Sequence, residues 1–172
     1  RDGPRRADAA GASALLLRGS GNTAQPMPVS FRVVRAKTIV APLTLDQLQE
    51  VRVLHSGDRY EFAFSTLQAG RFLLDSLTDS ADWRWSLKGP NASGSVVALR
   101  SDVAFNARES NSSWLNLDVP GNYTLSVYSS SLSAGNVSFR LLDGARFAPL
   151  PLNAPQTVAL APGNAVQAWH LD

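Results

Sequence analysis

Apolar and polar residues alternate in short segments between residues 50 and 141. In Tyr60–Phe64 and Trp83–Leu87, every second residue is aromatic or leucine. Alternation with a period of two over five to seven residues predicts strands that bury one face. Turn signals rich in glycine, proline and asparagine separate the segments. About eight short strands at this spacing predict an all-β protein, an antiparallel β-sandwich or jelly-roll-like fold. The other alternating segments are Glu50–Leu54, Leu115–Val119, Tyr123–Val127 and Val137–Leu141.

The inward-facing positions of these segments predict a single core. Tyr123 follows the turn at Pro120 and Gly121, and we expect its ring to be buried and its hydroxyl to reach a backbone partner at a sheet corner. Helical periodicity is absent, and residues 44–51 allow at most one helical turn. The predicted core is Val51, Val53, Phe62, Phe64, Phe72, Leu74, Trp83, Trp85, Leu87, Val97, Leu117, Val119, Tyr123, Leu125, Val127, Phe139 and Leu141.

The chain also repeats itself at domain length. The block Ser30–Val34 (SFRVV) returns as Ser138–Leu142 (SFRLL), and Ala41–Leu45 (APLTL) returns as Ala148–Leu152 (APLPL). The offsets are 108 and 107 residues. A repeat of this length indicates an array of modules. We therefore expect one complete repeat flanked by partial ones: residues 1–41 as the C-terminal strands of a preceding repeat, 42–148 as a complete β-sandwich, and 149–172 as the first strands of a following repeat.

The two partial repeats lack most of a core. A partial β-unit leaves apolar faces and strand edges uncovered. We therefore expect the flanks to pack on the central unit, on each other or on a neighbouring chain.

Composition narrows the class of protein. An apolar content of 44% with 17% charged residues is typical of an ordered globular protein. No cysteine is present, which excludes disulfides and thiolate metal sites. The net charge is +2 and the arginines are scattered, so we expect no nucleic-acid partner. No apolar run approaches the length of a bilayer span, and we expect no membrane insertion.

Three segments resemble bacterial pre-peptidase C-terminal (PPC-like) domains. They are Ser56–Phe62 (SGDRYEF), Asp82–Asn91 (DWRWSLKGPN) and Pro120–Val127 (PGNYTLSV), and the likeness covers about residues 49–142. The resemblance implies a β-sandwich appended to exported bacterial proteins. Members accompany secreted peptidases, and some related modules bind collagen or polysaccharide, sometimes with calcium. The chain departs from the calcium-binding relatives in lacking a dense acidic cluster, and no peptidase domain is present.

Three carboxylates form the candidate metal site. Asp75, Asp79 and Asp82 lie within eight positions around a turn, and oxygen ligands at such spacing suit calcium. The alternative is that aspartate and serine in this turn bond their own backbone. No other cofactor is indicated.

Trp114 is the candidate ligand contact. It is out of phase with the inward positions of Leu115–Val119, which places it on the outer face, in the preceding loop or over the end of the sandwich. An exposed tryptophan is a hint of a contact surface. Trp83 and Trp85 share a face with Leu87, which favours the core over a sugar-stacking platform.

The sequence does not indicate catalysis. The two histidines, His55 and His170, have no nucleophile pattern beside them, so we expect no enzyme. Four N-x-S/T sequons leave a eukaryotic glycoprotein as an alternative, although each lies in a turn where asparagine is common. The sequons begin at Asn91, Asn111, Asn122 and Asn136.

These features favour a non-catalytic structural or adhesive module of a large exported bacterial protein, secreted or on the cell surface. Its partners would be adjacent repeats of the same polypeptide. One alternative is a binding module for an extracellular polysaccharide or a collagen-like protein, with or without calcium. Another is an accessory domain of a secreted peptidase.

Overall fold

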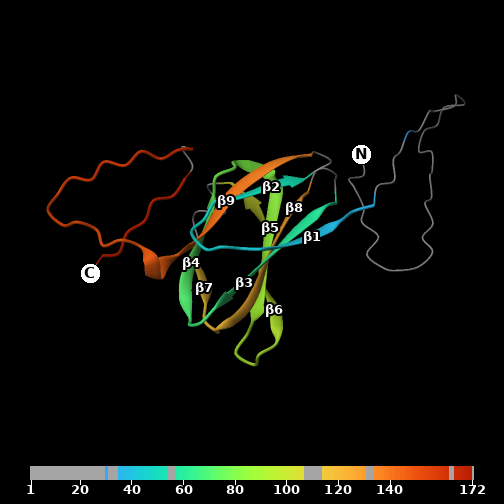
Figure 1. Cartoon of the computed structure of the whole chain (residues 1–172), viewed down its shortest axis with the longest axis horizontal. Helices are drawn as coiled ribbons and strands as arrows, with labels where there is room; N and C mark the ends of the chain where they lie inside the picture. The colour runs from blue at the N-terminus through green and yellow to red at the C-terminus, as the bar shows by residue number, and fades with distance from the viewer. Residues whose placement is uncertain are drawn as a thin grey trace, which may run out of the picture.

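The alternating segments form two β-sheets that pack face to face (Figure 1). The computed structural model describes residue 30 and residues 35–53, 57–106, 114–130, 134–162 and 165–171. Their strands are β1 (Thr38–Pro42), β2 (Gln49–Val53), β3 (Arg59–Thr66), β4 (Gly70–Ser76), β5 (Ser80–Pro90), β6 (Val96–Phe105), β7 (Leu115–Leu117), β8 (Gly121–Ser129) and β9 (Gly135–Asp143), followed by a 3-10 helix, η1 (Gly144–Arg146).

The strand order confirms an all-β sandwich. One sheet has the order β1-β3-β8-β5-β6 and the other β2-β9-β4-β7. All pairs between named strands are antiparallel except β1 with β3, which is parallel. In the described part of the chain, no helix is long and apolar enough to cross a membrane.

The predicted core is correct at most positions. Leu74, Leu87, Leu125 and Phe139 have no exposed surface. The alternation predicts that Val97 and Val119 are buried, but both are only half-buried. Val97 lies near the tip of the β5–β6 hairpin, which extends beyond the other strands, so no facing sheet covers it (Figure 1). The buried apolar residues that the predicted core leaves out are Leu43, Leu73, Ala104, Phe105, Leu115, Val137, Leu142 and Ala165.

Tyr123 occupies the predicted sheet corner. Its side chain is buried, and its hydroxyl donates a hydrogen bond to the backbone carbonyl of Val119. The ring stacks on Phe64, with 5.4 Å between ring centroids. It also lies against Gly89, where a Cβ would come within 2.1 Å of the ring. The absence of a side chain at residue 89 therefore makes room for the tyrosine.

Parts of both flanks contact the sandwich, as expected. β1 joins the five-stranded sheet through five residue pairs with β3. The boundary predicted after residue 41 thus falls inside β1, and the division of the chain into repeats stays a prediction. The C-terminal segment, by which we mean residues 147–162 and 165–171, leaves the sandwich as a loop on one side of the sheets (Figure 1) and returns to bond the four-stranded sheet at Val166.

Truncating Tyr123 tests this corner. We expect Tyr123→Ala to lower the free energy of unfolding by about 3–5 kcal/mol, because a large buried aromatic is removed. Tyr123→Phe should cost about 1 kcal/mol, because the ring stays in place and the hydrogen bond to Val119 is lost. Urea titration measures both values. A loss below about 1 kcal/mol for Tyr123→Ala would contradict the burial of this ring.

Candidate functional site

Asp75 forms a buried ion pair on the outer face of the four-stranded sheet. It lies on β4 directly opposite Arg140 on β9. The Asp75 side chain has no exposed surface, whereas 32% of the Arg140 side chain is exposed. Arg140 donates from Nε to Asp75 Oδ2 over 2.9 Å, and its Nη2 contacts the same oxygen. A buried carboxylate requires partners of this kind, because leaving it unpaired is costly.

The same pair binds the backbone of Val166 in the C-terminal segment. The Val166 N–H donates to Asp75 Oδ1 over 3.0 Å, and Arg140 Nη2 donates to the Val166 carbonyl over 3.4 Å. The backbone N–H and the backbone carbonyl of Val166 are therefore both hydrogen-bonded by the Asp75–Arg140 pair. The contact does not depend on the side chain of residue 166, and any residue except proline supplies the same two groups.

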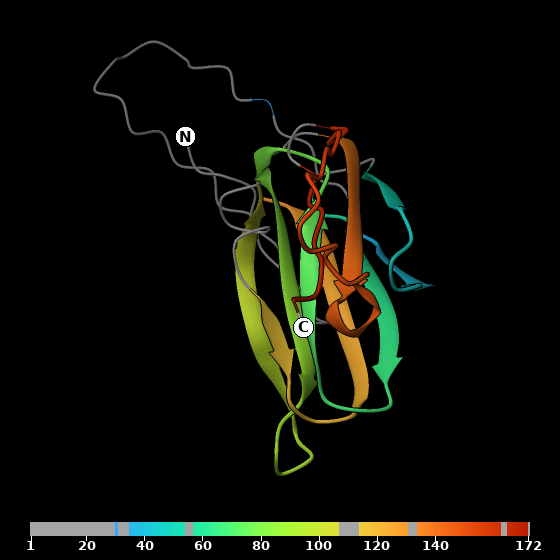
Figure 2. The same ribbon diagram turned by 90° about the vertical axis from the view of Figure 1, so that its left-hand side faces the viewer.

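Apolar residues surround the Asp75–Arg140 pair. Leu73 and Leu142 are opposite each other two positions away on β4 and β9, so they share the outer face with the pair. Both are buried, as is Ala165 next to Val166. Val166 thus meets the sheet where buried leucines flank the ion pair, at the side of the sandwich that faces the viewer in Figure 2.

The junction between β9 and the C-terminal segment is tied to the sandwich. Asp143 caps η1 by accepting from the Ala145 N–H over 3.0 Å. Asp46 accepts from the Asp143 N–H over 2.8 Å, and its other oxygen pairs with Arg146. Asp46 lies 97 residues before Asp143, so these bonds join the two ends of the sandwich.

Trp114 lies at this junction. It is half-buried just before β7, with the Arg71 guanidinium 4.6 Å from its ring centroid. Its ring is 5.8 Å from that of Phe147, which in turn is 6.3 Å from His170. The structure therefore packs Trp114 against the C-terminal segment. Its predicted role as a ligand contact stays a prediction.

The three predicted calcium ligands occupy different environments. Asp75 is buried and paired, Asp79 is exposed in the β4–β5 turn, and Asp82 is exposed on β5. Among the described residues, no three His, Cys, Asp or Glu side chains are grouped closely enough to hold a metal ion. The Ser80 hydroxyl accepts from the Asp82 N–H over 3.2 Å. This is a hydrogen bond between a turn side chain and the local backbone, as the alternative to calcium binding predicts. Calcium binding stays a prediction.

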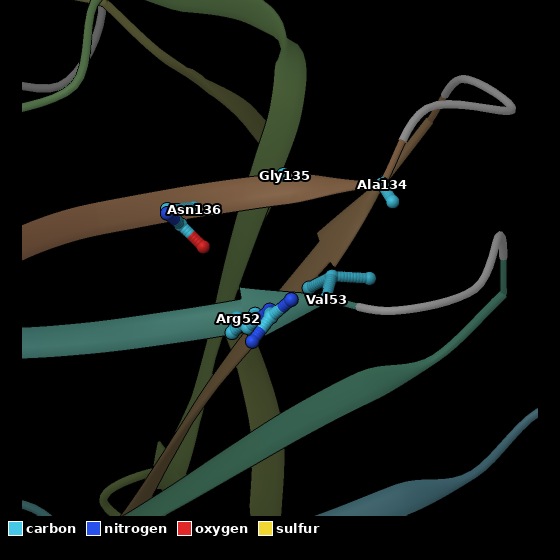
Figure 3. Close-up of a pocket in the computed structure, with 5 residues that line it drawn as sticks. All are labelled: Arg52, Val53, Ala134, Gly135 and Asn136. Carbon is cyan, nitrogen blue, oxygen red and sulfur yellow. The ribbon is translucent and has the colours of Figure 1, made fainter.

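A shallow pocket lies on the four-stranded sheet where β2 and β9 pair (Figure 3). It has a volume of about 370 Å³ and contains a single charged side chain, that of Arg52. This lining offers no pair of groups for acid–base or nucleophilic chemistry. Two residues named in the sequence analysis, the histidine His55 and the sequon asparagine Asn111, lie outside the described residues. The pocket residues are Arg52, Val53, Ala134, Gly135 and Asn136.

A polar network covers part of the outer face of the five-stranded sheet. The Tyr128 hydroxyl donates to Asp102 over 3.0 Å and lies 3.1 Å from the Ser86 hydroxyl. Burial raises the pKa of Tyr128, and the Arg59 guanidinium lies 4.8 Å from the centroid of its ring. Sequence reasoning missed this group. Asp102 itself has a positive φ of 54° and lies where the pairing of β5 and β6 is irregular.

Comparison with known proteins finds likeness in structure alone. No family model matches the chain, and no curated protein matches it. It is similar to the pre-peptidase C-terminal domain of a collagenase from Bacillus anthracis, with 12% identity, a TM-score of 0.44, and coverage of 64% of this chain and 99% of that domain. It is also similar to PliG of Aeromonas hydrophila, a periplasmic inhibitor of g-type lysozyme, with 13% identity, a TM-score of 0.40, and coverage of 62% and 99%. Neither likeness assigns a function to this chain.

Two arginines provide a test of the buried pair. We expect Arg140→Ala to lower the free energy of unfolding by about 3 kcal/mol, because it leaves the Asp75 carboxylate buried without a cation. Arg146→Ala should cost under about 1 kcal/mol, because that side chain is 62% exposed and its ion pairs are hydrated. Equal losses for the two variants in urea titrations would contradict the assigned role of Asp75.

A thermal melt tests the calcium prediction. Both oxygens of Asp75 already accept hydrogen bonds, so we expect no change in Tm when millimolar calcium is added. Addition of EDTA is the control, because it removes free calcium and should reverse any shift in Tm that calcium causes. A rise of several degrees that disappears in Asp79→Asn would show that an ion binds these carboxylates.

Proposed function

We propose that this chain is a non-catalytic structural β-sandwich module in a tandem array, carried by a large exported bacterial protein. The observation that carries the proposal is the bonding of the Val166 backbone by Asp75 and Arg140, which holds the start of the predicted following repeat against the sandwich. Such a module acts through spacing and presentation, and its partners are the adjacent repeats.

The internal repeat supports the array. Arg140 belongs to the block SFRLL, whose counterpart SFRVV contains Arg32 at the equivalent place. The arginine that binds the neighbouring segment is therefore present in both copies of the block. A contact directed at backbone groups also suits an array, because successive repeats differ in their side chains.

The junction supports a structural role over a flexible linker. Asp46, Asp143 and Arg146 form hydrogen bonds and ion pairs across the joint, and Trp114 packs on Phe147. A chain that leaves a domain through such contacts keeps a defined direction, whereas a linker rich in glycine and serine behaves as a random coil. A fixed direction between repeats is what a spacer or a display module needs.

Immunoblotting of the native host tests the proposal. An antibody raised against the purified chain should detect a polypeptide much longer than 172 residues in the envelope or the culture medium. Protease added to intact cells should remove the envelope signal, while a cytoplasmic marker protein stays intact. A band at the size of this chain alone, or a signal confined to the cytoplasm, would contradict an exported array.

A further inference from the structure

The start of the sandwich and the C-terminal segment share a backbone arrangement. In the sandwich, Pro42 pairs in parallel with Ala63, and the Leu43 N–H donates to the Ala63 carbonyl over 2.9 Å. In the C-terminal segment, Pro149 pairs in parallel with His170, and the Leu150 N–H donates to the His170 carbonyl over 2.7 Å. Each residue of the second set lies 107 positions after its counterpart, so the sequence repeat is also a repeat of hydrogen bonds.

A left-handed residue recurs at the same offset. Asp46 has a φ of 64° and Asn153 a φ of 61°, and they are two of the three residues other than glycine with positive φ in the described chain. Aspartate and asparagine tolerate this conformation better than most residues. The turn after the first strand therefore has the same backbone geometry in both places.

The two copies differ in how their apolar residues are covered. Val51, Val53 and Phe64 of the sandwich are 1%, 1% and 7% exposed. Their counterparts Val158, Leu160 and Leu171 are 42%, 45% and 74% exposed. Apolar positions that are buried in the core in the first copy are thus exposed in the second.

Strand formation differs for the same reason. Residues 49–53 form β2 because β9 pairs with them, whereas residues 156–160 form no strand. A strand needs a hydrogen-bonded neighbour and a covered face to be stable. The residues that correspond to the start of β1 lie in η1, so the first part of the β1–β3 ladder has no equivalent in the second copy. The Arg59 N–H donates to the Lys37 carbonyl, whereas the N–H of its counterpart Val166 donates to Asp75.

We propose that residues 148–171 are the opening strands of a second copy of this sandwich. The exposed apolar residues Val158, Leu160 and Leu171 are then docking positions for the remaining strands of that copy, the counterparts of β4 to β9. The occupant is identified by the 107-residue correspondence, since β9 is the strand that pairs with β2, and Val51 and Val53 belong to a core cluster to which each of β4 to β9 contributes. The inference rests on the proposed array function and specifies which surface joins the next repeat.

Completing the second copy tests this inference. The full chain is extended after Asp172, the counterpart of Ser65, by a second copy of residues 66–148. Backbone amide hydrogen exchange is then measured in the chain and in the extended chain. In the 172-residue chain the amides of Val158 and Leu160 should exchange freely. In the extended chain we expect them to exchange at least about 100-fold more slowly, because they would lie in a paired strand.

Leu160→Asp is the matched control. In the extended chain it puts a charge into the second core, and the slow exchange at residue 158 should be lost. In the 172-residue chain Leu160 is exposed, so the same change should leave the Tm of the sandwich unaltered. Free exchange at Val158 in the extended chain, or slow exchange that survives Leu160→Asp, would overturn the inference. The immunoblot is independent of this result, because a parent array can exist with its repeats joined through another surface.

Discussion

The carboxylate of Asp75 has no access to water although it lies on the outer face of a sheet. A charge in that position must have a cation and hydrogen-bond donors, because desolvation otherwise outweighs any gain. Arg140 supplies the cation from the neighbouring strand, and the Val166 N–H supplies a further donor. The burial of Asp75 therefore depends on the C-terminal segment, and the position of that segment depends on the ion pair. This mutual dependence connects the sandwich to the C-terminal segment.

The core gives this connection a rigid base. Tyr123 fixes one sheet corner through Val119 and Gly89, and the bonds of Asp46 to Asp143 and Arg146 fix the exit of β9. A buried ion pair adds little net stability by itself. We regard the Asp75–Arg140 pair as a device that specifies where the neighbouring segment lies, while the apolar core holds the sheets together.

Sequence reasoning predicted the elements whose signal is local. Alternation located β2, β3, β5, β7, β8 and β9, and the Pro-Gly turn located Tyr123, whereas β1, β4 and β6 have no alternating segment in the prediction. It did not reach the contacts whose partner is distant along the chain. Asp75 is close in sequence to Asp79 and Asp82, whereas its partner Arg140 is 65 residues away and Val166 is 91. Nothing near β1 in the sequence indicates its parallel pairing with β3. Val97 fits the core pattern but lies on the β5–β6 hairpin, which extends beyond the facing sheet.

The most direct test of this account is the exchange rate of the Val166 amide in the 172-residue chain, compared with its rate in Asp75→Ala. We predict that the amide is protected in the unaltered chain and that the substitution removes this protection, while amides in β3 and β8 stay protected. An amide at residue 166 that exchanges at the rate of an unfolded peptide in the unaltered chain would contradict the account. So would protection that is the same in both proteins, because Asp75 would then have no part in holding the C-terminal segment.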